Sequence, residues 1–139
     1  MTRVFISYSF EDRTFAQRVR EALASAGIGT YLDTEELPPG TDFASAIRNA
    51  VRSADAVVVI LSDKAIVRRQ IQFEIGMAQG LGKLVVAVVA PGSRPDLSLV
   101  TSLADTYVLD ADSLKGPELG ALINHALGTH QTGAGTRAS

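Results

Sequence analysis

Two short segments of the sequence are apolar at every position, and they restrict the fold more than any other feature. They are residues 56–61, with the sequence AVVVIL, and residues 84–89, with the sequence LVVAVV. Segments of this length and valine content are typical of strands in a parallel sheet that is covered by helices on both faces. The chain is therefore expected to adopt an α/β fold.

Further strands are predicted over residues 3–8, 28–33 and 106–110, and stretches of helical periodicity separate all five strands. Ser9 stands where a helix N-cap belongs, and Asp12, three residues later, is close to a capping box. The other helices are expected over residues 43–54, from about 67 to 81, and from Gly116–Pro117 to Gly128. Residues 96–104 are ambiguous and could form a short helix.

This alternation predicts a flavodoxin-like, doubly wound sheet of five parallel strands in the order 2-1-3-4-5, with helices on both faces. The length of 139 residues suits one domain, which we assign to residues 1–128. Residues 129–139 contain no large apolar side chain, so we expect a disordered tail or a linker there.

Composition excludes several classes of function. The chain has no cysteine, which removes disulfides and thiol catalysis, and only two histidines, so a metal site is not expected. A net charge of -2 gives no attraction to nucleic acid. No signal peptide or membrane-spanning run is apparent, which fits a cytoplasmic protein without contact with the membrane.

Ligands of doubly wound sheets bind at the carboxyl ends of the strands, near the switch point between the first and third. The residues after Tyr8 and after Leu61 are therefore the first to consider. Phosphate-binding glycine motifs and a nucleophile elbow are missing from the sequence. His125 and His130 come too late in the chain to serve Ser9 as a base, and we interpret them as surface residues.

Glu74 breaks the pattern of its helix. On a helical wheel of about 100° per residue, it lies within the apolar arc that contains Ile71, Ile75 and Ala78. A buried carboxylate costs several kcal/mol if it is charged and unpaired. It therefore lines a cleft, becomes protonated or pairs with another group. A glutamate at the margin of the stripe that reaches water or an arginine is the equally weighted alternative.

Other polar residues near the expected site have simpler interpretations. Asp33 ends the second strand, where aspartate commonly shapes a turn, although it could also bind a ligand hydroxyl. Glu35 and Glu36 fit solvated loop charges. Arg68 and Arg69 could bind a phosphate, but exposed arginines at the start of a helix are more often merely solvated.

Three segments of the chain carry a resemblance to a known family. They are residues 4–12, VFISYSFED; residues 31–33, YLD, followed by residues 36–40, ELPPG; and residues 58–62, followed by the helix with Phe73–Glu74. In this order they resemble the first signature box, the second box or BB loop, and the catalytic-glutamate segment of Toll/interleukin-1 receptor (TIR) domains of the bacterial type. The resemblance extends from Arg3 to about Leu127.

The resemblance implies an NAD+ nucleosidase that cleaves the nicotinamide–ribose bond, with NAD+ as the substrate and no further cofactor. Glu74 would be the catalytic residue that stabilises the cationic ribose. Water as acceptor gives ADP-ribose, and an internal acceptor gives a cyclic ADP-ribose isomer. Substrate-binding roles would belong to the loop after the first strand and to two further residues near the same cleft: Tyr8, Ser9, Phe10, Asp33 and Ser62.

The resemblance also implies self-association, possible filaments and a fused or separate sensor domain, as in bacterial anti-phage immune signalling. The loop at residues 34–41 would carry the contacts between TIR domains. Some family members are adaptors without catalysis, and that alternative stays open. The family often has Trp and Cys where this chain has Gln70 and Ile71, and some members have an arginine where it has Ser9.

A third hypothesis is a phosphoacceptor receiver, which shares the fold. A receiver needs acidic residues at the end of the first strand and an aspartate at the end of the third. Here Tyr8–Ser9 and Leu61–Ser62 occupy those positions, and Glu11, Asp12 and Asp63 come later. The sequence therefore argues against a receiver.

Overall fold

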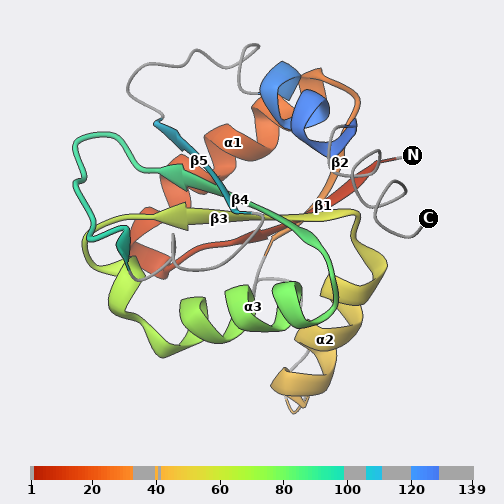
Figure 1. The fold of residues 1–139 in the computed structure, drawn as a ribbon, viewed down its shortest axis with the longest axis horizontal. Coiled ribbons are helices and arrows are strands. Elements are labelled where there is room, and N and C mark those ends of the chain that lie inside the picture. Colours follow the sequence, from red (N-terminus) through yellow and green to blue (C-terminus); the bar gives the residue numbers. More distant parts are fainter. Residues whose placement is uncertain (1, 33–39, 41, 99–105, 111–119, 129–139) are drawn as a thin grey trace.

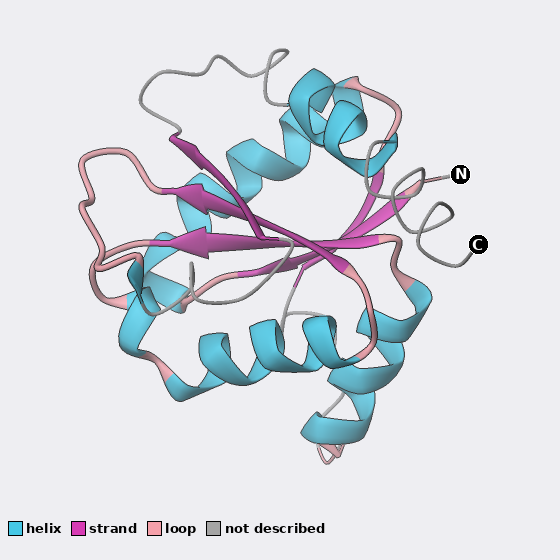
Figure 2. Ribbon diagram, viewed as in Figure 1, coloured by secondary structure: helices cyan, strands magenta, loops and turns pink. Residues whose placement is uncertain are grey.

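The computed structural model describes residues 2–32, 40, 42–98, 106–110 and 120–128. They form an α/β structure in which helices cover both faces of one sheet (Figures 1 and 2). The predicted loop at 34–41 lies outside the described residues except for Gly40. Asp33, the predicted start of the last helix at 116–119 and the predicted tail at 129–139 also lie outside them.

Five parallel strands form the sheet in the order β2-β1-β3-β4-β5, which confirms the predicted topology. The strands are β1 (Arg3–Ser7), β2 (Gly29–Leu32), β3 (Ala56–Leu61), β4 (Leu84–Val89) and β5 (Thr106–Asp110). In the register between β1 and β3, Ser7 lies opposite Val59. The strand order reverses between these two strands, so the switch point lies where the sequence predicted it.

The helices are α1 (Arg13–Ser25), α2 (Phe43–Ser53), α3 (Arg69–Gly80) and a last helix at residues 120–128. Short 3-10 helices, η1 (Phe10–Asp12) and η2 (Ala65–Val67), precede α1 and α3. After α1 the chain turns at Gly27, whose φ of 79° is the left-handed conformation that favours glycine.

Two apolar layers pack against the sheet. One layer joins Val4 and Ile6 of β1 to α1 and the helix at 120–128, and the other joins Phe5 of β1 to α2 and α3. Figure 1 shows the two pairs of helices on opposite faces of the sheet. Alternate residues of a strand point to opposite faces, so this division fixes which face each residue of β1 serves.

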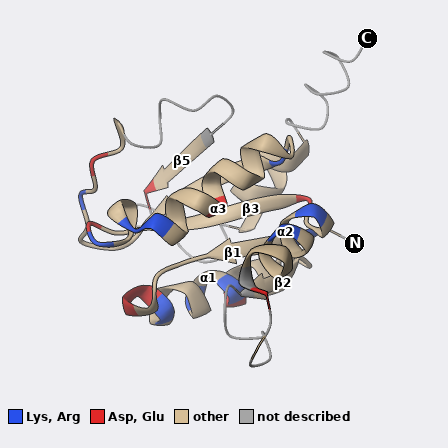
Figure 3. Ribbon diagram, turned by 90° about the horizontal axis from the view of Figure 1, so that it is seen from below, with Lys and Arg blue, Asp and Glu red and all other residues tan. Residues whose placement is uncertain are grey.

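The strand–helix pattern was predicted correctly, with differences at the element ends. The first strand was predicted to include Tyr8, but β1 ends at Ser7. The second strand was predicted to begin at Ile28, but β2 begins at Gly29. β3, β4 and β5 have the predicted bounds. Charged residues lie on the helices, the loops and the strand ends, and the middle of the central strands carries none, as expected for strands buried on both faces (Figure 3).

Candidate functional site

Buried polar side chains mark the carboxyl end of the β1–β3 strand pair. Four polar or charged residues are buried among the described residues: Ser7, Ser9, Ser62 and Glu74. Ser7 ends β1, Ser9 follows it, and Ser62 follows β3. Buried polar groups need hydrogen-bond partners, so a cluster of them at one place requires a specific arrangement.

Glu74 lies on the face of α3 that packs against the sheet, as the helical wheel predicted. Its side chain has no exposed surface, and it shares this buried face with Ile71, Ile75 and Ala78. The Ser7 hydroxyl donates a hydrogen bond to Glu74 Oε1. The bond is possible because Ser7 points to the same face of β1 as Phe5, which packs in the α3 layer.

Asp12 connects the two strand ends. Its Oδ2 accepts hydrogen bonds from the hydroxyl of Ser9 at 3.0 Å and from that of Ser62 at 2.6 Å. The Ser62 oxygen in turn accepts the backbone N–H of Ala65 at 3.1 Å. The predicted capping box is therefore wrong in detail. Ser9 precedes a 3-10 helix and its side chain caps no backbone N–H, and its hydroxyl donates a hydrogen bond to the Asp12 carboxylate.

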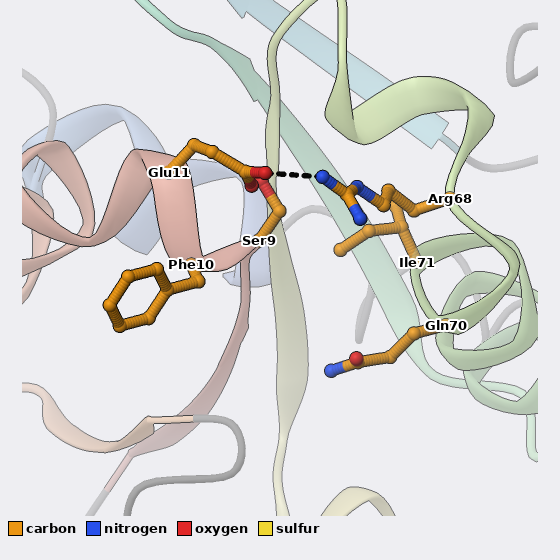
Figure 4. Close-up of a pocket in the computed structure, with 6 residues that line it drawn as sticks. All are labelled: Ser9, Phe10, Glu11, Arg68, Gln70 and Ile71. Atoms are coloured by element: carbon orange, nitrogen blue, oxygen red, sulfur yellow. Dashed lines mark hydrogen bonds and ion pairs between the residues drawn. The ribbon is translucent and has the colours of Figure 1, made fainter.

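A pocket of about 160 Å³ lies beside this cluster. It is lined by η1 and the residue before it on one side and by the start of α3 on the other: Ser9, Phe10, Glu11, Arg68, Gln70 and Ile71. In Figure 4 the side chains of Glu11 and Arg68 point toward one another from the two sides and form an ion pair. The Phe10 ring is turned away from that pair, and the Arg13 guanidinium lies 4.0 Å from its centroid.

The pKa of Glu11 lies below its ordinary value of 4.5. The largest cause is a hydrogen bond from its own backbone N–H. The Ser9 hydroxyl and the positive charges of Arg68 and Lys64 lower the pKa further, while desolvation raises it. Glu11 is therefore held as a carboxylate at neutral pH, and the pocket contains one negative and one positive side chain.

The family is identified by a model of the TIR domain that matches residues 4–122. This chain belongs to the TIR-domain family. None of the curated proteins matches its sequence.

Solved structures agree with this TIR assignment. The TIR domains of the activated Roq1 resistosome, which recognises the pathogen effector XopQ, are 25% identical with a TM-score of 0.55. That match covers 64% of this chain and 57% of the Roq1 chain. The TIR domain of the Toll-related receptor TRR-2 from Hydra magnipapillata is also 25% identical, with a TM-score of 0.62, and covers 79% of this chain and 84% of that one.

A third similarity concerns the fold alone. A 2-deoxyribosyltransferase from Bacillus psychrosaccharolyticus is 15% identical with a TM-score of 0.64, and the match covers 86% of this chain and 90% of that one. Within the described part of this TIR domain, no helix is both long enough and apolar enough to cross a membrane. The same residues contain no group of three His, Asp or Glu side chains that could hold a metal ion.

The structure brings some of the predicted site residues of the TIR domain together. Ser9 and Phe10 line the pocket, and Ser62 joins Ser9 through Asp12. Tyr8 is buried in the apolar layer on the α1 side of the sheet, so it lies on the other face from Glu74. Asp33 lies outside the described residues.

Glu74 is one helical turn from the pocket. Gln70 and Ile71, four and three residues before Glu74, line the pocket, while Glu74 itself lies beneath them in the core. Side chains of a helix lean toward its N-terminus, so the Glu74 carboxylate leans toward the turn that carries Gln70 and Ile71. Gln70, which stands where the family often has Trp, is thus a wall of the pocket. Phe73, on the same helix, is not among the residues that line the pocket.

Three residues of the site were missed by sequence analysis. Ser7 could have been found, because strand alternation places it on the same sheet face as Glu74. Asp12 was assigned to a helix cap, and only the relative position of β1 and β3 reveals its second partner, Ser62. Arg68 was expected to be merely solvated, and its ion pair with Glu11 joins residues 57 apart in the sequence.

Proposed function

We propose that this TIR domain is an NAD+ nucleosidase in which Glu74 stabilises the ribosyl cation. The proposal rests on one observation above the rest. The polar groups that are buried among the described residues cluster at the carboxyl end of β1 and β3, where doubly wound folds bind ligands. Membership of the TIR family supports the assignment.

The chemistry needs little from the protein besides a placed negative charge. The bond between ribose C1′ and the nicotinamide nitrogen breaks, and nicotinamide leaves with the electron pair as a neutral molecule. The positive charge moves to the ribose, where a carboxylate in a water-poor site stabilises it strongly. Water then bonds to C1′ and releases a proton, which gives ADP-ribose. An acceptor group within the substrate gives a cyclic isomer instead.

The site must open before this reaction can occur. Glu74 has no exposed surface, and the pocket of about 160 Å³ is smaller than the roughly 300–1,000 Å³ of ordinary small-molecule sites. We therefore propose activation by self-association through the loop at residues 34–41, with possible filaments and a fused or separate sensor in bacterial anti-phage signalling. The assembly of TIR domains in the Roq1 resistosome is consistent with such a step.

A non-catalytic TIR–TIR interaction module is the second candidate. The observation that favours it is the same closed site, together with Gln70 in a pocket wall where the family often has an aromatic ring. A glutamine side chain offers less stacking surface for a nicotinamide or adenine base. In this alternative Glu74 is a structural partner of Ser7.

The deciding experiment is NAD+ consumption, resolved by product chromatography, at low and high protein concentration. Wild-type protein is compared with Glu74→Gln, which keeps the shape of the side chain and an oxygen that can accept the Ser7 hydroxyl. We expect free nicotinamide from the wild type at high concentration and a loss of at least about 100-fold in the variant. The second product then identifies a hydrolase or a cyclase.

A matched control is Glu21→Gln, the same substitution on the exposed surface of α1. It should keep full turnover. Both variants should melt cooperatively near the wild-type temperature, since neither changes the shape of the core. Equal turnover in Glu74→Gln and wild type would contradict the proposal. Concentration-dependent assembly without nicotinamide release would identify the interaction module.

A further inference from the structure

Asp12 occupies an unusual position between two strand ends. Its Oδ2 accepts the protons of two serine hydroxyls that come from different parts of the chain, Ser9 after β1 and Ser62 after β3. Both serines are buried, with 8% and 7% of their surface exposed. Hydrogen bonds to an ionised acceptor are about twice as strong as those between neutral groups, so this arrangement is held firmly.

The hydrogen bond to Asp12 decides what Ser9 can offer a ligand. A hydroxyl has one proton to donate and two lone pairs that accept. The Ser9 hydroxyl donates its proton to Asp12 Oδ2 at 3.0 Å, and it also lowers the pKa of the neighbouring Glu11 carboxyl. Ser9 lines the pocket, and with its proton directed to a carboxylate its oxygen can serve a ligand there only as an acceptor. A ligand group must bring the proton, as the hydroxyl groups of a ribose do.

Ser62 is fixed in a different way. Its proton goes to Asp12, and its oxygen accepts the N–H of Ala65 at the start of η2. It is not among the residues that line the pocket. Ser62 therefore anchors Asp12 to the β3 side of the switch point, and Asp12 in turn sets the direction of the Ser9 hydroxyl.

We propose that Asp12 is a positioning residue that makes Ser9 a dedicated hydrogen-bond acceptor for a hydroxyl group of the substrate. The proposal rests on the proposed NAD+ nucleosidase function and names the class of group that Ser9 recognises. Asp12 acts through Ser9 and Ser62. Replacement of Asp12 should therefore weaken the binding of the ligand more than it slows the chemical step at Glu74.

Asp55 provides a matched control at the opposite end of the same strand pair. Its Oδ2 accepts the backbone N–H of Arg3 at 2.8 Å, and so it also joins the start of β3 to β1. Asp55 is exposed and lies far from the pocket residues in the fold. Asp55→Ala removes the same chemical group from beside the same strand pair without touching Ser9.

The test measures the Kd for NAD+ by calorimetry. All variants are made in the Glu74→Gln background, in which NAD+ is not cleaved during the measurement. The protein concentration is the one at which the wild type shows its highest turnover. We expect Asp12→Ala to raise Kd about tenfold, close to the effect of one lost hydrogen bond to the ligand. Ser9→Ala should raise it similarly, and the two together should raise it little further. Asp12→Asn should recover part of the affinity, and Asp55→Ala should leave Kd unchanged.

Several outcomes separate the two proposals. NAD+ turnover that depends on Glu74, combined with an unchanged Kd in Asp12→Ala, overturns the positioning role and leaves the nucleosidase standing. The positioning role is also overturned if the fold-increases in Kd from Asp12→Ala and Ser9→Ala multiply in the double variant. It is overturned as well if Asp55→Ala raises Kd and lowers the melting temperature to a matching extent. NAD+ binding that depends on Asp12 without any turnover supports the positioning role and overturns the nucleosidase. Failure of both the wild type and Glu74→Gln to bind NAD+, without turnover by the wild type, overturns both.

Discussion

The two ends of the β1–β3 strand pair are joined by aspartates in opposite environments. At the amino end, exposed Asp55 accepts the backbone N–H of exposed Arg3. At the carboxyl end, Asp12 accepts the hydroxyls of two buried serines, and the Ser7–Glu74 hydrogen bond lies in the core nearby. Exposed partners keep access to water, whereas buried partners must satisfy one another.

We interpret this difference as that between a structural contact and a functional site. At the amino end, a water-exposed aspartate adds one hydrogen bond to the backbone ladder that joins the two strands. The carboxyl end uses buried polar groups for the same purpose, and a buried polar pair is often no more stabilising than an apolar one. Its position is the end of the sheet where ligands bind in doubly wound folds. The proposed function accounts for an arrangement that stability alone does not require.

The largest expected effect comes from making the carboxyl end apolar. In the double variant Ser7→Ala/Glu74→Leu, both partners of the buried hydrogen bond are replaced by apolar side chains that suit the core. We expect NAD+ turnover to be lost and the free energy of unfolding to rise by about 1–4 kcal/mol. Urea denaturation beside the nicotinamide assay measures both. A less stable double variant would show that this pair is a structural requirement, and the comparison would fail.

Ser7→Ala alone should have the opposite effect on stability. The substitution removes the donor and leaves the Glu74 carboxylate buried without that hydroxyl. We expect a loss of about 1–3 kcal/mol in the free energy of unfolding. Denaturation curves of the single and double variants, recorded under the same conditions, give the two values. If Ser7→Ala unfolds at the wild-type midpoint, then the hydroxyl does not stabilise Glu74.

Asp55→Ala should cost less than Ser7→Ala, because water replaces the lost acceptor at the exposed amino end. We expect a loss of about 0.5–1.5 kcal/mol and unchanged NAD+ turnover. The same denaturation and nicotinamide assays apply. A loss of turnover at this distance from the pocket would mean that the two ends of the strand pair are coupled, and the functional interpretation of the carboxyl end would weaken.

Sequence analysis was most successful where one residue type repeats with a fixed period. The apolar segments 56–61 and 84–89 have no polar interruption, so the strands, their order and the switch point were predicted correctly. Glu74 was found in the same way, as a polar residue within an apolar helical arc. The elements and the place of Glu74 need only local spacing, and the strand order follows from that alternation by the general rules for doubly wound sheets.

The partners of the site residues could not be predicted in that way. Ser62 and Asp12 are 50 residues apart, and Ser7 and Glu74 are 67 apart. Their hydrogen bonds depend on the register between β1 and β3 and on how α3 crosses the sheet, which no local pattern specifies. Asp12 also had a satisfactory local explanation as part of a capping box, and this explanation hid its long-range role.

The smallest expected effect concerns acid pH and Glu11. Because the pKa of Glu11 is lower in the folded protein than its ordinary value of 4.5, its charged form stabilises the fold. That contribution is complete above this value and is lost as the pH falls through the lower, folded pKa. Melting curves of wild type and Glu11→Gln should therefore differ slightly at pH 7 and converge at acid pH, once Glu11 is protonated in both the folded and the unfolded state.

The main cause of the lowered pKa is the backbone N–H of Glu11 rather than its exposed ion pair with Arg68, so Arg68→Gln should keep most of the pH dependence. If Arg68→Gln abolished it, the ion pair across the pocket would be the dominant interaction, and the pocket would then depend on a salt-sensitive contact instead of the local fold of η1.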